Sequence, residues 1–178
     1  LVPDMDEVMD LCVRYGVTLL EDTCESMGSK YKGKKLGTFG MMSTFSTYFG
    51  HHISTIEGGI ISTNNYDLYD LMRIKRSHGL ARESERFQQY VDKYPQISKQ
   101  FMFVTDGYNF RNTELCAVLG RSQLKRLDKY IEKRNVNYSK FISLIKKYSE
   151  KFVVPEYHDG ISNFCLPLLC KDKKTSHF

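Results

Sequence analysis

The sequence predicts a layered α/β fold built on a parallel sheet, and three observations lead to this prediction. Residues 4–15 repeat apolar side chains at helical spacing, and Gly16 is a helix stop signal. Residues 17–20 follow as a short apolar run typical of a buried strand. Two more strand-like runs, 44–48 and 60–63, lie downstream. A helix that leads into a short apolar strand is typical of βαβ-type folds with a parallel sheet.

The segment that follows the first predicted strand carries polar side chains. It reads EDTCESMG, which places Asp22 near the C-terminal edge of a strand. That edge is where open α/β sheets bind their ligands. Residues 29–37 then predict a hairpin that turns at Lys32 and Gly33.

The next elements are predicted to be two buried strands and a helix. The strands cover 44–48 and 60–63, and the turn signal Asn64-Asn65 closes the second. Residues 66–77 return to helical spacing.

The second half of the chain is predicted to be mostly helical. Residues 80–100 are polar and rich in Tyr and Gln without a clear period, which indicates a long, partly helical excursion. Residues 113–124 predict a helix capped by Thr113, and 128–148 predict a longer one. The remaining predicted elements are strands at 152–155 and 164–170, the second weakened toward a sheet edge by Pro167.

Composition is that of a soluble globular protein of about one domain. The chain has 178 residues, of which 41% are hydrophobic and 26% charged. Its apolar runs are too short to span a membrane, so no membrane partner is expected. The first residues are acidic and amphipathic and do not resemble a secretory signal. The chain also starts in the middle of a pattern without Met, which indicates a piece of a longer protein.

Charge and cysteine usage exclude several classes of function. The net charge is +5, but the densest cluster, Lys30, Lys32, Lys34 and Lys35, lies in the predicted hairpin and is interpreted as solvated. No nucleic-acid partner is therefore expected. The five cysteines are odd in number and form no CxxC pair, which excludes a disulfide framework or a four-cysteine zinc site. These features predict a cytoplasmic protein.

The most unusual chemistry lies in TFSTYFGHHISTIEGGIIST, residues 44–63. His51 and His52 are adjacent, and no further ligand follows at the spacing that zinc sites use. Neighbouring side chains on a strand point to opposite faces, so the pair is not expected to bind one metal ion. The other groups that can carry chemistry are Asp22, Glu25, Ser46, Glu57, Asn109 and Arg111.

Three segments carry a resemblance to a known family. LLEDTCESMGSKYKGKKLGTFG resembles the strand-and-hairpin segment of the DegT/DnrJ/EryC1/StrS sugar aminotransferases. TFSTYFGHHISTIEGGIIST is similar to that family's phosphate-and-lysine segment, and GYNFRNTELCAVLGRSQLKRLD to its downstream segment. The order is the same in the family. The resemblance implies the α/β fold of fold-type-I, aspartate-aminotransferase-like enzymes that bind pyridoxal 5′-phosphate (PLP).

The resemblance also implies a division of the chain. Residues 1–127 would be part of the large PLP-binding domain and 128–150 a connecting helix. Residues 151–178 would be the truncated start of the small C-terminal domain. Full-length members of the family are much longer than this chain.

Four cofactor-contacting positions follow from the resemblance. Asp22 matches the aspartate that pairs with the pyridine nitrogen, which makes the ring an electron sink. Ser46 matches a serine that binds the cofactor phosphate. Asn109 matches an asparagine that reaches the phosphate in the neighbouring subunit, which implies a homodimer. Glu25 is an acidic residue where many of the aminotransferases have Gln.

His51 departs from the aminotransferases, in which a lysine stands at this position. Imidazole has no primary amine and cannot form the imine that this lysine makes with the cofactor. It can still move protons near neutral pH. His51 is therefore the expected catalytic residue, working with pyridoxamine 5′-phosphate (PMP) that is not covalently bound. His52 is interpreted as a neighbour that faces away or orients a loop, and Glu57 as part of a structural turn.

A histidine at this position resembles the sugar 3-dehydratases of the same family. The resemblance implies a nucleotide-linked 4-keto-6-deoxy hexose as substrate and glutamate as amino donor. His51 would remove a proton at C4′ of the cofactor and protonate the departing 3-hydroxyl. One type of these enzymes uses an iron–sulfur cluster, but the matching region, 76–93, contains no cysteine. Cys165 and Cys170 are expected to pack in a core instead.

Two other functions stay open. The first is a nucleotide-sugar aminotransferase in which another residue replaces the lysine, although the nearest lysines, Lys35 and Lys75, fall in the predicted hairpin and helix. The second is a non-catalytic PLP-fold protein that binds a ligand or partner. The joint presence of Asp22, Ser46 and Asn109 beside His51 favours an enzyme over a binding protein.

Overall fold

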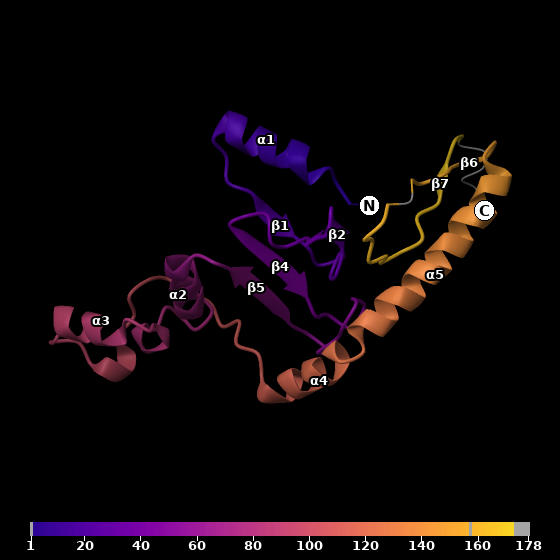
Figure 1. The fold of residues 1–178 in the computed structure, drawn as a ribbon. Coiled ribbons are helices and arrows are strands. Elements are labelled where there is room, and N and C mark those ends of the chain that lie inside the picture. Colours follow the sequence, from indigo (N-terminus) through magenta and orange to yellow (C-terminus); the bar gives the residue numbers. More distant parts are fainter. Residues whose placement is uncertain (1, 157, 173–178) are drawn as a thin grey trace.

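A computed structural model describes residues 2–156 and 158–172, and its centre is a three-stranded sheet (Figure 1). The strand order is β1-β4-β5, where β1 is Leu20–Asp22, β4 is Met42–Ser46 and β5 is Gly59–Thr63. β1 runs parallel to β4, whereas β5 runs antiparallel to it. The parallel sheet predicted from the sequence is thus confirmed for one strand pair and wrong for the other.

Helix α1, Met5–Tyr15, forms where the apolar spacing predicts it. The Asp4 side chain accepts hydrogen bonds from the first-turn N–H groups of Asp6 and Glu7. Gly16 ends the helix in a left-handed conformation. The strand predicted for 17–20 is wrong, because the chain first completes this C-terminal cap and β1 begins only at Leu20.

The hairpin predicted at 29–37 is confirmed as β2, Lys30–Tyr31, paired with β3, Lys34–Lys35. Lys32 and Gly33 both have positive φ, as a tight two-residue turn requires. The chain after the hairpin is fastened by the buried Glu21 carboxylate of β1. It accepts hydrogen bonds from three backbone N–H groups at 2.5–2.6 Å, those of Gly37, Phe39 and Gly40.

Helix α2, Tyr66–Lys75, begins at Asn65, whose side chain accepts a hydrogen bond from the N–H of Leu68. The strand before it, β5, is not buried as the sequence predicts, since Ile60 and Ile61 are about half exposed. No other segment of the described chain fully covers these two side chains of the sheet.

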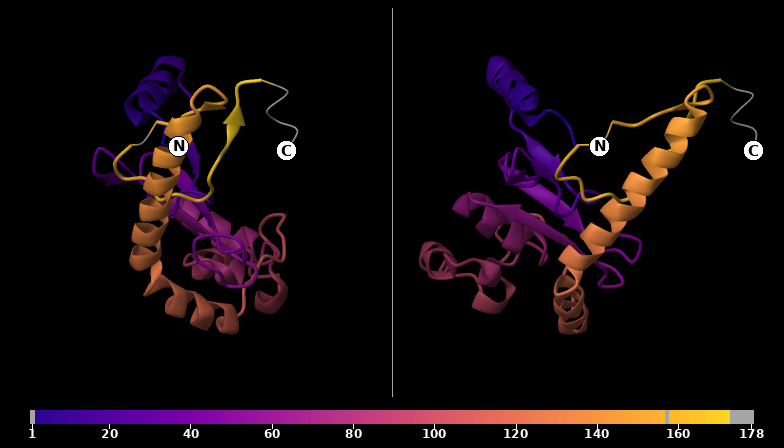
Figure 2. Two further views of the ribbon diagram at one scale, coloured as in Figure 1. Left: turned by 90° about the vertical axis from the view of Figure 1, so that its right-hand side faces the viewer. Right: turned by 45° about the vertical axis from the view of Figure 1, so that its right-hand side comes forward.

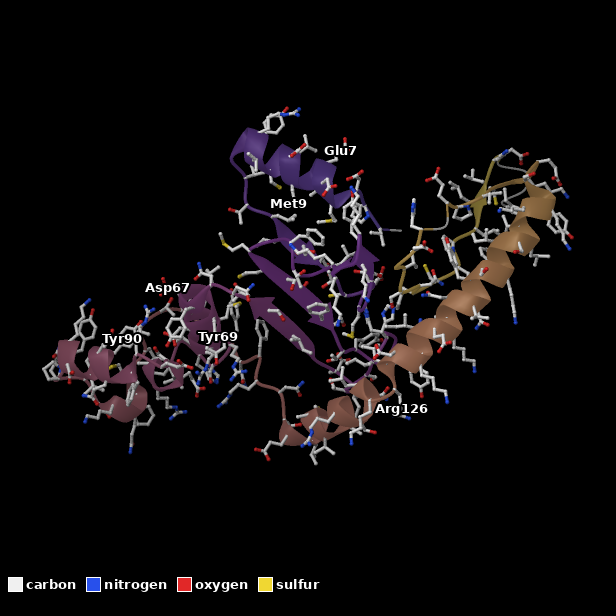
Figure 3. All side chains as sticks on the ribbon, in the orientation of Figure 1. Glu7, Met9, Asp67, Tyr69, Tyr90 and Arg126 are labelled. Atoms are coloured by element: carbon white, nitrogen blue, oxygen red, sulfur yellow. The ribbon has the colours of Figure 1, made fainter. Side chains whose placement is uncertain are left out.

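Residues 80–100 form a partly helical excursion, as the sequence predicts. They contain α3, Phe87–Lys93, between the short 3₁₀ turns η1, Ala81–Glu83, and η2, Lys99–Phe101. Their own hydrophobic cluster is centred on Ala81, Val91 and Met102. Figure 3 shows Asp67 and Tyr69 on α2 and Tyr90 on α3, on the side of the molecule away from the long C-terminal helix.

The C-terminal part is built along one long helix. Thr113 caps α4, Glu114–Leu124, and α5, Leu127–Ile145, continues into the 3₁₀ turn η3, Lys146–Tyr148. The chain then forms β6, Phe152–Val153, and returns along α5 before β7, Leu169–Cys170 (Figures 1 and 2). The strand predicted for 164–170 is therefore confirmed only in its last two residues. Cys165 is exposed rather than packed in a core.

The returning segment packs against both α5 and the N-terminal residues. A buried cluster of Tyr138, Ile142 and Ile161 joins α5 to this segment, and Val2 packs against it. A separate cluster of Met27, Ile53 and Leu127 lies at the start of α5, below the sheet. Among the described residues, no helix is both long and apolar enough to span a membrane.

Candidate active site

Asp22 is the last residue of β1, and two neighbours hold its carboxylate. Oδ1 accepts hydrogen bonds from the Cys24 N–H at 3.1 Å and from the Thr44 hydroxyl at 3.3 Å. The register of the β1–β4 pair sets Thr44 opposite Asp22. Hydrogen bonds from Cys24, then from Thr44, and the nearby charge of His51 lower the pKa of Asp22. The carboxylate is therefore ionised at neutral pH, at the strand edge where the sequence places it.

His51 lies in the loop that follows β4 and contacts the segment after β1. Its Nδ1 lies 2.8 Å from the backbone carbonyl oxygen of Cys24. A carbonyl oxygen only accepts hydrogen bonds, so Nδ1 of the neutral ring carries the proton. The other nitrogen, Nε2, then has the free lone pair. This is the nitrogen through which His51 can take up and return a proton.

His52 has the opposite arrangement. Its side chain is 4% exposed, and Nε2 lies 3.2 Å from the carbonyl oxygen of Ser162. Nδ1 is buried without a hydrogen-bond partner. Burial, reinforced by the positive charge of Arg134, lowers the pKa of His52. The ring is neutral with its proton on Nε2, and it connects the loop to residue 162.

A metal ion does not explain the histidine pair. The His51 ring bonds to the carbonyl oxygen of Cys24, and the His52 ring bonds to that of Ser162. Among residues 2–156 and 158–172, no three His, Cys, Asp or Glu side chains form a group that could hold a metal ion.

Phe164 is a site residue that the sequence analysis missed. Its ring centroid lies 5.4 Å from that of His51 and 5.8 Å from that of His52. Tyr48 packs edge-on against His51 from another side, at 6.1 Å. The sequence assigned Phe164 to a strand, and its only signal was an aromatic residue in the run FCLPLLC.

Ser46, the last residue of β4, lines a cavity of about 690 Å³. Cys24 and Thr44, which hold Asp22, line the same cavity, and so do three arginines, Arg73, Arg76 and Arg111. The Ser46 Oγ accepts a hydrogen bond from the Tyr48 N–H at 3.2 Å, and its own proton is free to be donated. A serine hydroxyl and guanidinium groups together suit a phosphate.

The loop between β4 and β5 has a rigid frame. The hydroxyls of Thr47 and Thr55 lie 2.7 Å apart, and the Thr47 N–H donates to the carbonyl of Gly58 at 2.9 Å. Gly58 has φ +154°, and a Cβ there would lie 2.6 Å from both threonine hydroxyls and from the Asn112 amide. Only glycine fits this position. The Glu57-Gly58 turn therefore shapes the loop that carries the two histidines.

Glu25 and Asn109 complete the set of predicted site residues. Glu25 is exposed and shares a smaller cavity of about 260 Å³ with Asp22, Ser162 and Phe164. Asn109 is also exposed, and its side-chain oxygen accepts a hydrogen bond from Arg111 at 3.1 Å. Within the described chain, its recorded contacts are with Arg111 and, through the backbone, with Ser77. The structure thus gathers Asp22, Glu25, Ser46 and His51 at one end of the sheet and leaves Asn109 apart.

These groups fit a pyridoxal phosphate. Asp22 offers an ionised carboxylate for the ring nitrogen, and Ser46 with the arginines offers donors for the phosphate. The lysines nearest to His51 on either side in the sequence do not take its place: Lys35 lies on the exposed β3, and the ammonium of Lys75 is 3.1 Å from both carboxylate oxygens of Asp106.

Comparison with known proteins shows which proteins the chain is similar to. The GDP-4-keto-6-deoxy-D-mannose 3-dehydratase of Yersinia pseudotuberculosis is 37% identical over 150 residues, which are 82% of this chain and 37% of the relative. A GDP-perosamine synthase of Escherichia coli O157:H7 is 36% identical over 131 residues, or 74% of this chain and 32% of the relative.

A solved structure has the same fold. A GDP-4-keto-6-deoxymannose-3-dehydratase with a trapped PLP–glutamate geminal diamine superposes with a TM-score of 0.79 at 29% identity. The match covers 97% of this chain and 45% of that one. The chain therefore has part of a PLP-dependent aminotransferase fold, and it spans less than half the length of these relatives.

The family profile of the DegT/DnrJ/EryC1/StrS aminotransferases matches residues 1–178, the whole sequence. Together with the fold and the relatives, this match shows that the chain belongs to the DegT/DnrJ/EryC1/StrS aminotransferase family.

Proposed function

We propose that the chain is part of a PLP/PMP-dependent 3-dehydratase that acts on a nucleotide-linked 4-keto-6-deoxy hexose in the synthesis of deoxysugars for surface polysaccharides. The observation that carries this proposal is the state of His51. A histidine stands where a transaminase needs an amine, and its Nδ1 is bonded to a backbone carbonyl so that Nε2 is left as the base. The 3-dehydratase of Yersinia is a relative with this activity in its name.

The cofactor would be held by residues at the ends of β1 and β4. Asp22 would pair with the ring nitrogen, with Thr44 and Cys24 holding its carboxylate in place. Ser46 would donate to the phosphate. Glu25, exposed beside Asp22, would face the same site from the other cavity. When bound as PMP, the cofactor supplies an amine for the keto group and a ring that accepts an electron pair.

His51 would carry the proton chemistry. Nε2 would take a proton from C4′, and the resulting imidazolium would keep its Nδ1–H on the Cys24 carbonyl. The Asp22 carboxylate, held ionised, would stabilise the positive charge nearby. Nε2 would then give its proton to the oxygen of the departing 3-hydroxyl, so His51 would act first as base and then as acid.

Glutamate is the proposed amino donor that restores the amine form of the cofactor. The PLP–glutamate adduct in the similar dehydratase structure supports this assignment. The sugar's nucleotide is left open between GDP and CDP, with GDP supported by the names of the relatives.

The proposed protein is a homodimer in which Asn109 serves the neighbouring subunit's cofactor. Asn109 is exposed and is flanked by Tyr108 and Phe110, two exposed aromatic rings stacked at 5.0 Å. Exposed apolar side chains of this kind mark interaction surfaces. We also propose a cytoplasmic location, which suits five unpaired thiols.

The proposed domain division places residues 1–127 in the large domain, 128–150 in the connecting helix and 151–178 in the small domain. The course of α5 supports it, since this helix leads away from the sheet toward the β6–β7 pair (Figure 1).

The test is a product analysis of the purified protein. It is incubated with PLP, glutamate and either GDP- or CDP-linked 4-keto-6-deoxy hexose, and the sugar is analysed by mass spectrometry. Loss of the 3-oxygen supports the dehydratase. An amino sugar as the product would replace it with the aminotransferase, the alternative that the GDP-perosamine synthase relative represents. No change in the absorbance of PLP or PMP on mixing would favour a protein that binds another partner.

A further inference from the structure

Residues 161–164 return from the far end of α5 and lie against the histidine pair. Ile161 and Ser162 are buried, and Ile161 packs on Tyr138 and Ile142 of α5. Phe164 then lies against the rings of His51 and His52. We call residues 161–164 the return segment. More than 100 residues separate it from the histidines in sequence, so only the fold brings the two together.

Two consecutive residues of α5 hold the return segment from one side. The Asn135 amide donates to the carbonyl of Ile161 at 2.5 Å and accepts from the N–H of Asn163 at 3.2 Å. The Arg134 guanidinium donates to the carbonyls of Asn163 and Phe164 at 3.4 and 3.2 Å. The backbone on both sides of Ser162 is therefore bonded to the helix.

The loops of the large domain hold the same segment from the other side. The N–H of Ser162 donates to the Ser29 hydroxyl at 2.9 Å, and its carbonyl accepts from Nε2 of His52. Both bonds are buried, where a lost partner costs more than at the surface. With the backbone bonded on two sides, the position of the Phe164 ring is determined by the fold.

The orientation of His51 needs more than its one hydrogen bond. The bond from Nδ1 to the Cys24 carbonyl is a single contact, and a half-turn of the ring about the Cβ–Cγ bond would break it and put carbon Cδ2 in the place of Nδ1. Phe164 covers one face of the ring at an interplanar angle of 30°, and Tyr48 meets it edge-on. These contacts oppose rotation and keep Nε2 on the side away from Cys24.

We propose that Phe164 is a positioning residue for His51, and that the return segment carries the placement of α5 into the reaction site. The expected effect on kcat rests on the proposed function. The orientation predicted for the His51 ring does not depend on enzymatic activity. Phe164 itself takes no part in proton transfer, since it has no titratable group.

The test compares Phe164→Leu with Phe164→Tyr and with a matched control, Phe87→Leu. Phe87 is a half-buried aromatic of α3 that packs against the cluster of Ala81, Val91 and Met102, not against the cluster that contains Ile161. Nitrogen-15 NMR of histidine-labelled protein, assigned by loss of one signal in His51→Asn, reports which ring nitrogen carries the proton. We expect the Nδ1–H form of His51 in the wild type and in Phe164→Tyr, and a mixture of both neutral forms in Phe164→Leu. The control should match the wild type.

The kinetic readout separates positioning from binding. Phe164→Leu should lower kcat about 10-fold with KM for the nucleotide sugar within about twofold, because the base is misplaced while the substrate still binds. Phe164→Tyr should restore kcat. If Phe164→Leu fails to fold, Arg134→Met, which removes both hydrogen bonds that Nη1 donates to the carbonyls of Asn163 and Phe164, should shift the His51 tautomers in the same direction.

Two outcomes would overturn the inference. A folded Phe164→Leu with an unchanged His51 signal contradicts it, and so does an equal loss of the Nδ1–H form in the Phe87 control. If the wild type performs no dehydration, the proposed function fails, yet the NMR comparison still decides whether Phe164 holds the ring.

Discussion

His51 and His52 are adjacent in sequence and donate to backbone carbonyls through different ring nitrogens. His51 uses Nδ1 toward Cys24 at 2.8 Å, and His52 uses Nε2 toward Ser162 at 3.2 Å. The first ring keeps a lone pair on the nitrogen farther from the backbone, whereas the second buries its lone pair without a partner. Two chemically identical side chains therefore differ in the nitrogen that donates and in the nitrogen that keeps its lone pair.

Replacing His51 by lysine should convert the mode of cofactor binding. The His51→Lys amine would form a covalent bond to PLP that borohydride makes permanent, and dehydration should fall by at least about 100-fold because the proton-transfer group has changed. Intact-protein mass after reduction detects the adduct, and the wild type treated in the same way is the control. Full dehydration activity in His51→Asn would show that His51 does not move the proton.

The buried state of His52 predicts that the folded protein loses stability in mild acid. Burial lowers its pKa below the ordinary 6.5, so the unfolded chain binds the proton more readily than the folded one. The contribution of the neutral ring is present above pH 6.5 and is lost as the pH falls through the lowered value. His52→Gln keeps a donor for Ser162 and should cost about 1 kcal/mol at pH 7.5, with less dependence on pH between 7 and 5.

Urea unfolding at several pH values measures this effect. His52→Gln and the wild type are compared at each pH. Equal pH slopes for the wild type and His52→Gln would show that His52 does not titrate on unfolding in this range.

Gly58→Ala should destabilise the fold. The added Cβ would lie 2.6 Å from the Thr47 and Thr55 hydroxyls at a φ of +154°, and such strain costs on the order of 1–3 kcal/mol. Gly50→Ala, one residue before His51, is the control, because its Cβ would meet only Tyr48 at an ordinary 3.6 Å. Thermal unfolding should separate the two variants, and similar transition temperatures would contradict the predicted crowding at residue 58.

Mixed dimers test whether Asn109 acts across subunits. His51→Asn and Asn109→Ala proteins should each be nearly inactive alone. If each site takes His51 from one subunit and Asn109 from the other, a mixed dimer has one intact site. Unfolding and refolding an equal mixture should then recover about a quarter of wild-type activity, since half of the dimers are mixed. No recovery, with dimers formed, would place Asn109 in its own subunit's site.

The elements that the sequence predicts well are those with local signals. Asp4 and Gly16 bound α1, Thr113 caps α4, and the Lys32-Gly33 turn makes the hairpin. Asp22 at a strand end follows from the same local pattern. The strand predicted for 17–20 is wrong because the run has the apolar residues of a strand, whereas its backbone completes the C-terminal cap of α1.

The parts that the sequence does not show depend on contacts distant along the chain. Thr44 holds Asp22 only because two strands pair in a particular register. Phe164 reaches His51 only because the chain after α5 runs back along that helix. Apolar periodicity in the sequence contains no information about this reversal. The opposite tautomers of the histidines likewise depend on Cys24 and Ser162, whose carbonyls are not side-chain signals at all.

The excursion at 80–100 is attached to α2, where Glu85 accepts hydrogen bonds from the Tyr66 hydroxyl at 2.6 Å and from Arg73 at 3.1 Å. The buried Asp70 of α2 accepts hydrogen bonds from the Ser84 hydroxyl at 2.6 Å and from the Glu85 N–H at 2.8 Å, and the cluster around Met102 shares no member with the clusters near the sheet. A change in the length of the excursion should therefore disturb α2, and with it Arg73 of the cavity beside Ser46, before it reaches the loop that carries His51.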